Sequence, residues 1–232
     1  MPNVLVLYHS NYGHIAAMAE AVAQGAASAG ATVTIRRVPA LLDAADAAAA
    51  GHHPDDTPVA NVRELADNDA IVFGTPTHFG NMTAAMKHFL DRCSGLWVRD
   101  ALVGRIGSVF TSSESQHGGQ EHTLLSMHAS LMHLGMMVVG LPYTFKGQTR
   151  MDEITGGSPF GATTLAGAHG GGYRTPSANE LAGARFQGRH VAETARSVVL
   201  GRRQAVPDLP PPGLETVGGG QALASSTRTV SA

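Results

Sequence analysis

The sequence holds a single cysteine, Cys93, and few charged residues, and these shortages limit what the protein can be. One cysteine excludes a framework of intramolecular disulfides. The formal net charge is −2, which gives no electrostatic reason to expect a nucleic acid or an anionic membrane as partner. No apolar run approaches the roughly 20 residues that a transmembrane helix needs, and the N-terminus lacks the basic region of a signal peptide. We therefore expect a globular, cytoplasmic protein without membrane insertion.

Motifs for a metal and for a dinucleotide fold are also missing. The sequence has no H-E-x-x-H motif and no Cys/His cluster, and the spacing of its later histidines scatters them around a helix (His117, His122, His128 and His133). We therefore predict no metal. The loop after the first apolar run contains no G-x-G-x-x-G, which disfavours dinucleotide binding there.

Short apolar runs alternate with helical patterns along the chain. Five runs are predicted as strands, at residues 4–7, 32–38, 69–74, 105–110 and 136–139. Apolar residues at helical spacing follow them and predict helices from residue 15 to Gly30, and at 82–93, 121–134 and 179–200. This order predicts an α/β fold with a single five-stranded parallel sheet.

Three further segments have a distinct composition. Residues 39–68 are rich in alanine and then in turn residues, and we predict two short helices there, the second at 62–66. Residues 156–172 are rich in glycine and predicted to be a loop. Residues 201–232 have almost no core-forming side chains and are predicted to be a disordered tail on a domain of residues 1–200.

Polar residues and glycines follow the first, third and fourth predicted strands. Ligands of parallel sheets lie beyond the carboxyl ends of the strands, so these three loops are expected to meet at one site. The first loop precedes a helix, whose free N–H groups and positive dipole end suit a phosphate. The second offers backbone N–H groups and the aromatic face of Phe79 to the edge of a flavin ring, and the third is too polar to pack a core. Together they predict a mononucleotide cofactor, held by residues chosen from Ser10, Asn11, Tyr12, Gly13, His14, Ile15, Pro76, Thr77, His78, Phe79, Ser112, Ser113, Glu114, Ser115, Gln116, His117 and Gly118.

Each of these features also has a purely structural interpretation. Ser10 and Asn11 are common in ordinary turns and N-caps, and Phe79 could return to the core. Trp97, the single tryptophan, could be a core or interface residue instead of the wall of a slot for a planar substrate. His133 could interact with the end of its helix instead of contacting a cofactor.

Several motifs together resemble the WrbA-type NAD(P)H:quinone oxidoreductases. They are Tyr12-Gly13-His14-Ile15, Gly74-Thr75-Pro76-Thr77, Phe79-Gly80-Asn81-Met82, Gly95-Leu96-Trp97, Gly118-Gly119-Gln120-Glu121, His133 with Gly135-Met136, Gly161-Ala162-Thr163-Thr164 and Arg185-Phe186-Gln187-Gly188. The resemblance extends from about residue 3 to residue 200.

This resemblance implies a flavodoxin-like, doubly wound sheet with helices on both faces, FMN as cofactor and a homotetramer with active sites near subunit contacts. It implies that the first loop holds the FMN phosphate, and the second and third loops the ring and ribityl chain. It also implies that Tyr12 contacts the nicotinamide nucleotide, Trp97 the quinone and His133 the flavin.

The function expected from the sequence is FMN-dependent, two-electron reduction of quinones to hydroquinones by NADH or NADPH, in a ping-pong mechanism. Two alternatives remain open, an electron-transfer flavodoxin and an FMN-binding regulatory or scaffold protein without turnover. Electron carriers of this kind tend to be strongly acidic, which the charge of −2 does not favour.

Overall fold

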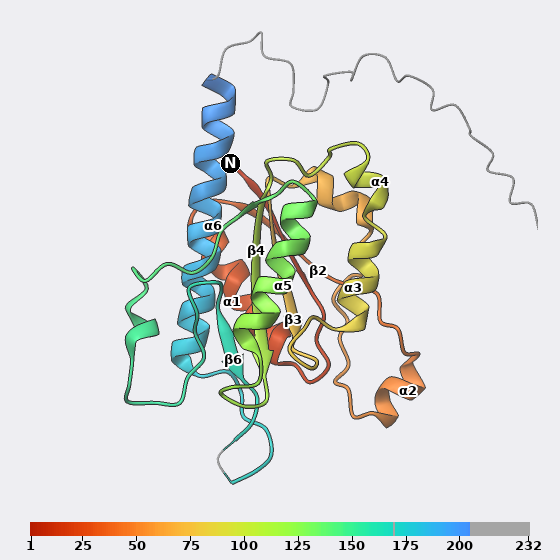
Figure 1. The fold of residues 1–232 in the computed structure, drawn as a ribbon, viewed down its shortest axis with the longest axis vertical. Helices are drawn as coiled ribbons and strands as arrows, with labels where there is room; N and C mark the ends of the chain where they lie inside the picture. Colours follow the sequence, from red (N-terminus) through yellow and green to blue (C-terminus); the bar gives the residue numbers. More distant parts are fainter. Residues whose placement is uncertain (169, 205–232) are drawn as a thin grey trace, which may run out of the picture.

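Figure 1 shows the computed structural model, which describes residues 1–168 and 170–204. Its centre is a parallel sheet with strand order β2-β1-β3-β4-β5, and β6 pairs with β4. The strands are β1 (Asn3–Tyr8), β2 (Thr32–Arg37), β3 (Ala70–Pro76), β4 (Ile106–Ser113), β5 (Met137–Val138) and β6 (Thr163–Leu165).

Helices cover both faces of this sheet (Figure 1). α1 and α6 pack on one face, and α3 and α5 cover the other. The helical elements are α1 (His14–Ser28), α2 (Ala44–Ala49), η1 (Val62–Asp67), α3 (Ala84–Asp91), α4 (Ser94–Trp97), α5 (Gln120–His133), η2 (Lys146–Thr149) and α6 (Ala178–Gln204). The two short helices expected within residues 39–68 are present as α2 and η1.

β1 is buried on both faces, as its uninterrupted apolar run predicts. Val4 and Val6 belong to the core beneath α1 and α6, whereas Leu5 and Leu7 belong to the core beneath α3. Alternate side chains of a strand point to opposite faces, so every residue of this run is apolar.

Glycines allow α1 and α6 to approach backbone to backbone. A Cβ atom on Gly25 would lie 1.9 Å from the carbonyl oxygen of Arg185, and one on Gly188 would lie 2.0 Å from that of Val22. This contact packs α6 directly against α1, although α6 comes last in the described chain.

The sheet has one strand more than the five predicted. β6 lies inside residues 156–172, where we expected only a loop, and it pairs with residues 111–113 of β4. β5 pairs only with Ile106 and Gly107, which leaves the far half of β4 free to receive β6. A three-residue strand between glycines is too short to show a periodic pattern, and this explains why the prediction was wrong there.

β4 also continues three residues beyond its predicted end at residue 110, to Ser113. Thr111 belongs to the ladder with β3, and its hydroxyl donates to the carbonyl of Thr75 at 2.7 Å. Polar side chains at the end of a strand can be buried in this way because neighbouring backbone groups accept their hydrogen bonds.

α6 continues to Gln204, four residues past the predicted boundary at residue 200. The remainder of the predicted tail, residues 205–232, lies outside the described residues.

Candidate functional site

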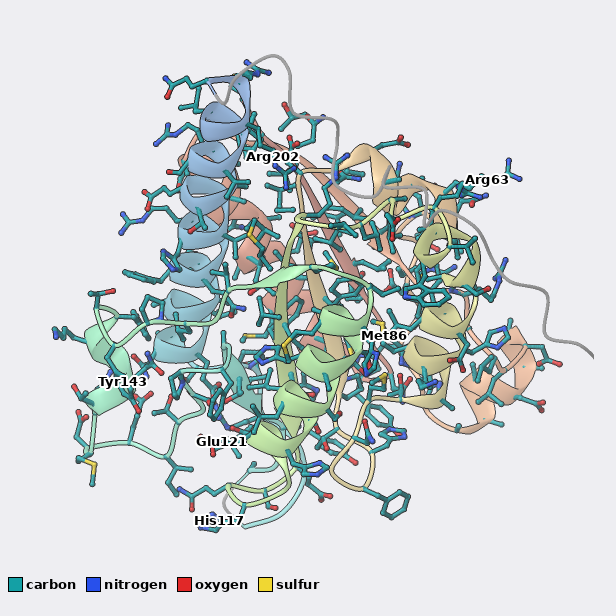
Figure 2. All side chains as sticks on the ribbon, turned by 45° about the horizontal axis from the view of Figure 1, so that its top comes forward. Arg63, Met86, His117, Glu121, Tyr143 and Arg202 are labelled. Carbon is teal, nitrogen blue, oxygen red and sulfur yellow. The ribbon has the colours of Figure 1, made fainter. Side chains whose placement is uncertain are left out.

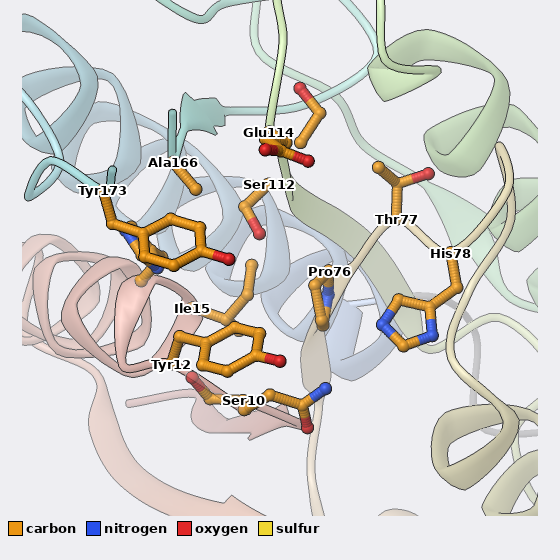
Figure 3. A pocket seen from close by; sticks show the side chains of 13 residues that line it. Ser10, Tyr12, Ile15, Pro76, Thr77, His78, Ser112, Glu114, Ala166 and Tyr173 are labelled. Atoms are coloured by element: carbon orange, nitrogen blue, oxygen red, sulfur yellow. The ribbon is translucent and has the colours of Figure 1, made fainter. Parts of the chain in front are cut away.

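A cavity of about 300 Å³ lies at the carboxyl ends of β1, β3 and β4 (Figure 3). We call it the strand-end cavity. The three loops predicted to meet do meet here. The cavity is lined by Ser10, Asn11, Tyr12, His14, Ile15, Pro76, Thr77, His78, Ser112, Ser113, Glu114, Ala166 and Tyr173. We call its residues that end or follow β1, β3 and β4 the strand wall, and Ala166 with Tyr173 the return wall.

The β1–α1 loop places a helix N-terminus against the strand-end cavity. Gly13 is the N-cap of α1, with φ of 85°, and it supplies no side-chain cap. The hydroxyl of Ser10 accepts from the amides of Gly13 and Ala16 at 3.2 and 3.4 Å. His14 and Ile15, the first residues of α1, both line the cavity. Amides at the positive end of a 15-residue helix, beside a hydroxyl, form a suitable environment for a phosphate.

The β3–α3 loop contains a tight turn that separates its residues into two groups. His78 and Asn81 exchange backbone hydrogen bonds of 2.7 and 3.1 Å, and Phe79 and Gly80 between them have φ of 52° and 79°. Pro76 to His78 line the cavity, whereas the ring of Phe79 is fully exposed. Phe79 therefore does not line the strand-end cavity within one chain, and its contact with a flavin stays a prediction.

The β4–α5 loop is similarly divided. Ser112, Ser113 and Glu114 line the strand-end cavity. Gln116 and His117 instead border a separate hollow beside the start of α5, and Figure 2 shows His117 at the outer end of the loop. Ser115 and Gly118 line neither of these two hollows. Residues 115–118 thus lie outside the strand-end cavity, and their contacts with a cofactor stay a prediction.

Sequence reasoning missed the return wall. The ring of Tyr173 stacks on that of Tyr12, with centroids 5.6 Å apart and an angle of 14° between planes (Figure 3). His14 Nε2 lies 2.7 Å from the carbonyl oxygen of Arg174, which ties the same segment to α1. The one signal for this wall was the Thr163-Thr164-Leu165 run of β6, to which no role was assigned.

A buried carboxylate holds the return wall in place. Glu180 accepts from Arg174 Nη2 at 2.5 Å, from the amides of Gly156, Leu165 and Ser177, and from the Thr164 hydroxyl. Burial alone would raise the pKa of Glu180, but these hydrogen bonds, first that of Arg174, more than offset it and lower the pKa. The side chain is therefore ionised at neutral pH and joins β6 and the segment after it to α6.

Trp97 and His133 lie together, but not in the strand-end cavity. They share a surface hollow of about 390 Å³, which we call the Trp97 hollow, with Lys87, Leu90, Asp91, Ser94, Ser130 and Leu134. None of these residues lines the strand-end cavity, and the side chain of Trp97 is 58% exposed. Within one chain, the residues predicted to contact the quinone and the flavin are thus separate from those predicted to bind the cofactor phosphate.

Within residues 1–168 and 170–204, no helix is long and apolar enough to cross a membrane. The same residues contain no group of three or more His, Cys, Asp or Glu side chains arranged to hold a metal ion.

Comparison with known proteins gives consistent matches. Residues 2–149 match the family described as NADPH-dependent FMN reductase. A Paracoccus denitrificans protein named NAD(P)H dehydrogenase (quinone) is 65% identical over 205 residues, 88% of this chain and 99% of the relative. NAD(P)H dehydrogenase (quinone) 3 of Rhizobium meliloti is 61% identical over 90% of this chain and 99% of its own length. The crystal structure of a flavodoxin, WrbA-like protein from Agrobacterium tumefaciens aligns with a TM-score of 0.60 and 28% identity, over 85% of this chain and 99% of that one.

Proposed function

The chain belongs to the family of NADPH-dependent FMN reductases, and we propose that it reduces quinones to hydroquinones by two electrons in a ping-pong mechanism. It is a flavoprotein oxidoreductase acting on quinones, with FMN as cofactor and NADH or NADPH as co-substrate. The resemblance to WrbA-type enzymes and the flavodoxin-like fold expected from the sequence are confirmed. The same proposal places the enzyme in the cytoplasm, where reduced nicotinamide nucleotides are available.

The strand-end cavity is the observation that carries this proposal. Its residues fit FMN: an open helix N-terminus beside Ser10 suits the phosphate, and the hydroxyls of Thr77 and Ser112 suit a ribityl chain. Asn11 is buried, and its side-chain oxygen has no hydrogen-bond donor among the described residues. A buried acceptor of this kind is costly unless a ligand donates to it.

FMN, when bound, supplies the redox chemistry by accepting an electron pair from the reduced nicotinamide and passing it to the quinone. The protein chain positions the reactants and excludes water from the strand-end cavity. Tyr12 and Tyr173 form an aromatic wall at the cavity on which a planar ring can stack. We propose that nicotinamide and quinone use this space one after the other, which gives ping-pong kinetics.

We further propose that the enzyme is a homotetramer in which Trp97 and His133 of one subunit complete the strand-end cavity of another. The separation of the Trp97 hollow from that cavity supports this arrangement, because both sets of residues were expected at one active site. The exposure of Trp97 on the surface of a single chain also supports it, since large aromatic side chains are typical of interfaces.

Steady-state oxidation of NADH by the FMN-loaded protein, with and without benzoquinone, tests the function. We expect quinone-dependent turnover and parallel double-reciprocal lines. Intersecting lines would overturn the ping-pong order. FMN binding without quinone-dependent turnover would contradict the enzymatic proposal and favour an electron carrier or a regulatory protein.

Subunit mixing tests the shared site. Ser10→Glu places a negative charge where the phosphate would bind and should abolish FMN binding, whereas Trp97→Ala should raise the quinone KM and leave FMN content unchanged. If sites are shared, refolding the two variants together restores part of the activity. The matched control mixes Trp97→Ala with the double variant Ser10→Glu/Trp97→Ala, which should restore none. Equal activity in both mixtures would contradict a shared site.

A further inference from the structure

A second cavity, of about 410 Å³, borders the strand-end cavity. Ser10 and Asn11 line both cavities, so the two are neighbours across the start of the β1–α1 loop. The other walls come from the end of β2, from α2 and from residues 52–55. We call it the α2 cavity.

The walls of the α2 cavity are joined to the loop expected to hold FMN. The amide of His53 donates to the carbonyl of Asn11 at 2.7 Å, and the ring of His52 packs edge-on against Tyr12 with centroids 5.5 Å apart. Arg37 Nε donates to the carbonyl of Thr57 at 2.8 Å, which fixes the segment that follows residue 55. Hydrogen bonds and an aromatic contact thus hold the walls of the α2 cavity against the β1–α1 loop.

The chemistry of this lining combines an apolar surface with a positive charge. Small apolar side chains of α2, among them Ala47 and Ala48, form one side. Burial first, and then electrostatic interaction with His78 and His52, lowers the pKa of His9 to about 4, so His9 is neutral at pH 7 and Arg37 is the cation of this lining.

Two carboxylates also line the α2 cavity, and both have hydrogen-bond partners. Asp43 caps α2 by accepting from the amide of Asp46 at 2.9 Å. Asp55 accepts from the Tyr8 hydroxyl at 2.8 Å and from the amide of Thr57 at 2.9 Å. Their lone pairs are therefore partly occupied, and their negative charges are shared with Tyr8 and with backbone amides.

We propose that the α2 cavity binds the adenosine half of the nicotinamide dinucleotide, while the nicotinamide reaches the strand-end cavity. An adenine ring can pack on the alanines of α2, and Arg37 can face the phosphates. This inference rests on the proposed function, because it assumes that the dinucleotide delivers electrons to FMN at the strand-end cavity.

The neighbouring hollows fit this role less well. One that also borders Ser10 is lined by three carboxylates, Glu20, Asp55 and Asp56, with no arginine or lysine beside them, so it would repel a pyrophosphate. The hollow beside the start of α5 shares no residue with the strand-end cavity. The α2 cavity also contains two carboxylates, but of these three hollows it is the one that contains an arginine, Arg37, and contacts the cofactor loop.

Two hydride donors distinguish an effect on adenosine binding from an effect on hydride transfer. They are NADH and reduced nicotinamide mononucleotide, which lacks the adenylate half. Ala47→Trp should fill the α2 cavity and lower kcat/KM for NADH by about 10-fold or more, with no change for the mononucleotide. Ala45→Trp, on the same helix but outside the cavity lining, is the matched control and should change neither. Ala48→Met provides a second, smaller obstruction in case Ala47→Trp does not fold.

Calorimetric titration of the FMN-loaded protein with 5′-AMP gives a readout without turnover. We expect binding to the wild type and to Ala45→Trp, and weaker binding to Ala47→Trp. Equal kcat/KM for the two donors in the wild type, or an equal loss for both in Ala47→Trp, would overturn the adenosine assignment. If the wild type oxidises neither donor, the proposed function fails, and the 5′-AMP titration still tests the cavity.

Discussion

The two walls of the strand-end cavity are built by different means. The strand wall consists of residues that end or directly follow buried strands, so the register of β1, β3 and β4 fixes their positions. The return wall comes from a segment whose one strand, β6, has three residues, and it depends on the hydrogen bonds of Glu180. A site can thus have one wall specified by the sheet and another held by one buried side chain.

Removing the carboxylate of Glu180 should have the largest effect, because the return wall depends on it. Glu180→Ala leaves Arg174, Leu165 and other donors next to the return wall without their partner, and loss of one member of a buried ion pair costs about 3–5 kcal/mol. We expect a decrease of this size in the free energy of unfolding, measured by urea denaturation. Glu193→Ala, on the same helix in an exposed pair with Arg189, is the control and should change it by no more than about 1 kcal/mol.

The same residue predicts a pH dependence. Because folding lowers the pKa of Glu180 below its ordinary value of 4.5, the unfolded chain takes up the proton first as pH falls. The contribution of Glu180 is therefore complete above that value and is lost as pH falls through the lowered pKa. Glu180→Gln should remove this part of the pH dependence of stability. An unchanged profile would show that the carboxylate does not stabilise the return wall in this way.

A change in the strand wall should affect the cofactor more than the fold. Ser10→Ala removes the hydroxyl beside the proposed phosphate position, and a hydrogen bond to a charged group contributes about 1.5–3 kcal/mol. We therefore expect the Kd for FMN to rise roughly 10- to 100-fold, measured by quenching of flavin fluorescence. The apoprotein should lose only about 1 kcal/mol, since the hydroxyl also accepts from Gly13 and Ala16. A loss of stability with an unchanged Kd would contradict the phosphate assignment.

The smallest effect concerns the contact between the walls. Tyr12 belongs to the strand wall and Tyr173 to the return wall, and aromatic pairs contribute about 0.5–1.5 kcal/mol beyond their buried area. A double-mutant cycle with Tyr12→Leu and Tyr173→Leu should give a coupling energy in the free energy of unfolding at the lower end of this range, because both rings are partly exposed. Zero coupling would show that the walls are held independently.

The residues predicted correctly to meet at the site were those tied to strong local patterns. Ser10, Thr77 and Ser112 each end or follow an apolar run at the carboxyl edge of a parallel sheet, and this placement brings them together without any detailed knowledge of packing. Phe79 and His117 lie near the same runs but point elsewhere, because the positive φ of Phe79 and the extension of β4 are decided by local geometry that residue type does not reveal. Glu180 gave no signal, since a glutamate near the start of a helix is usually explained by the helix dipole alone.

The sequence by itself determined the family, the alternation of strands and helices, and the edge of the sheet at which the three polar loops meet. These properties follow from period, polarity and motifs, which act over a few neighbouring residues. Tertiary structure alone decided that β6 completes the sheet beside β4, that Tyr173 stacks on Tyr12, and that Trp97 with His133 forms a separate surface hollow. Such contacts join residues far apart in the chain, and they stabilise the protein only when folding brings both partners together. The local sequence pattern therefore does not predict them.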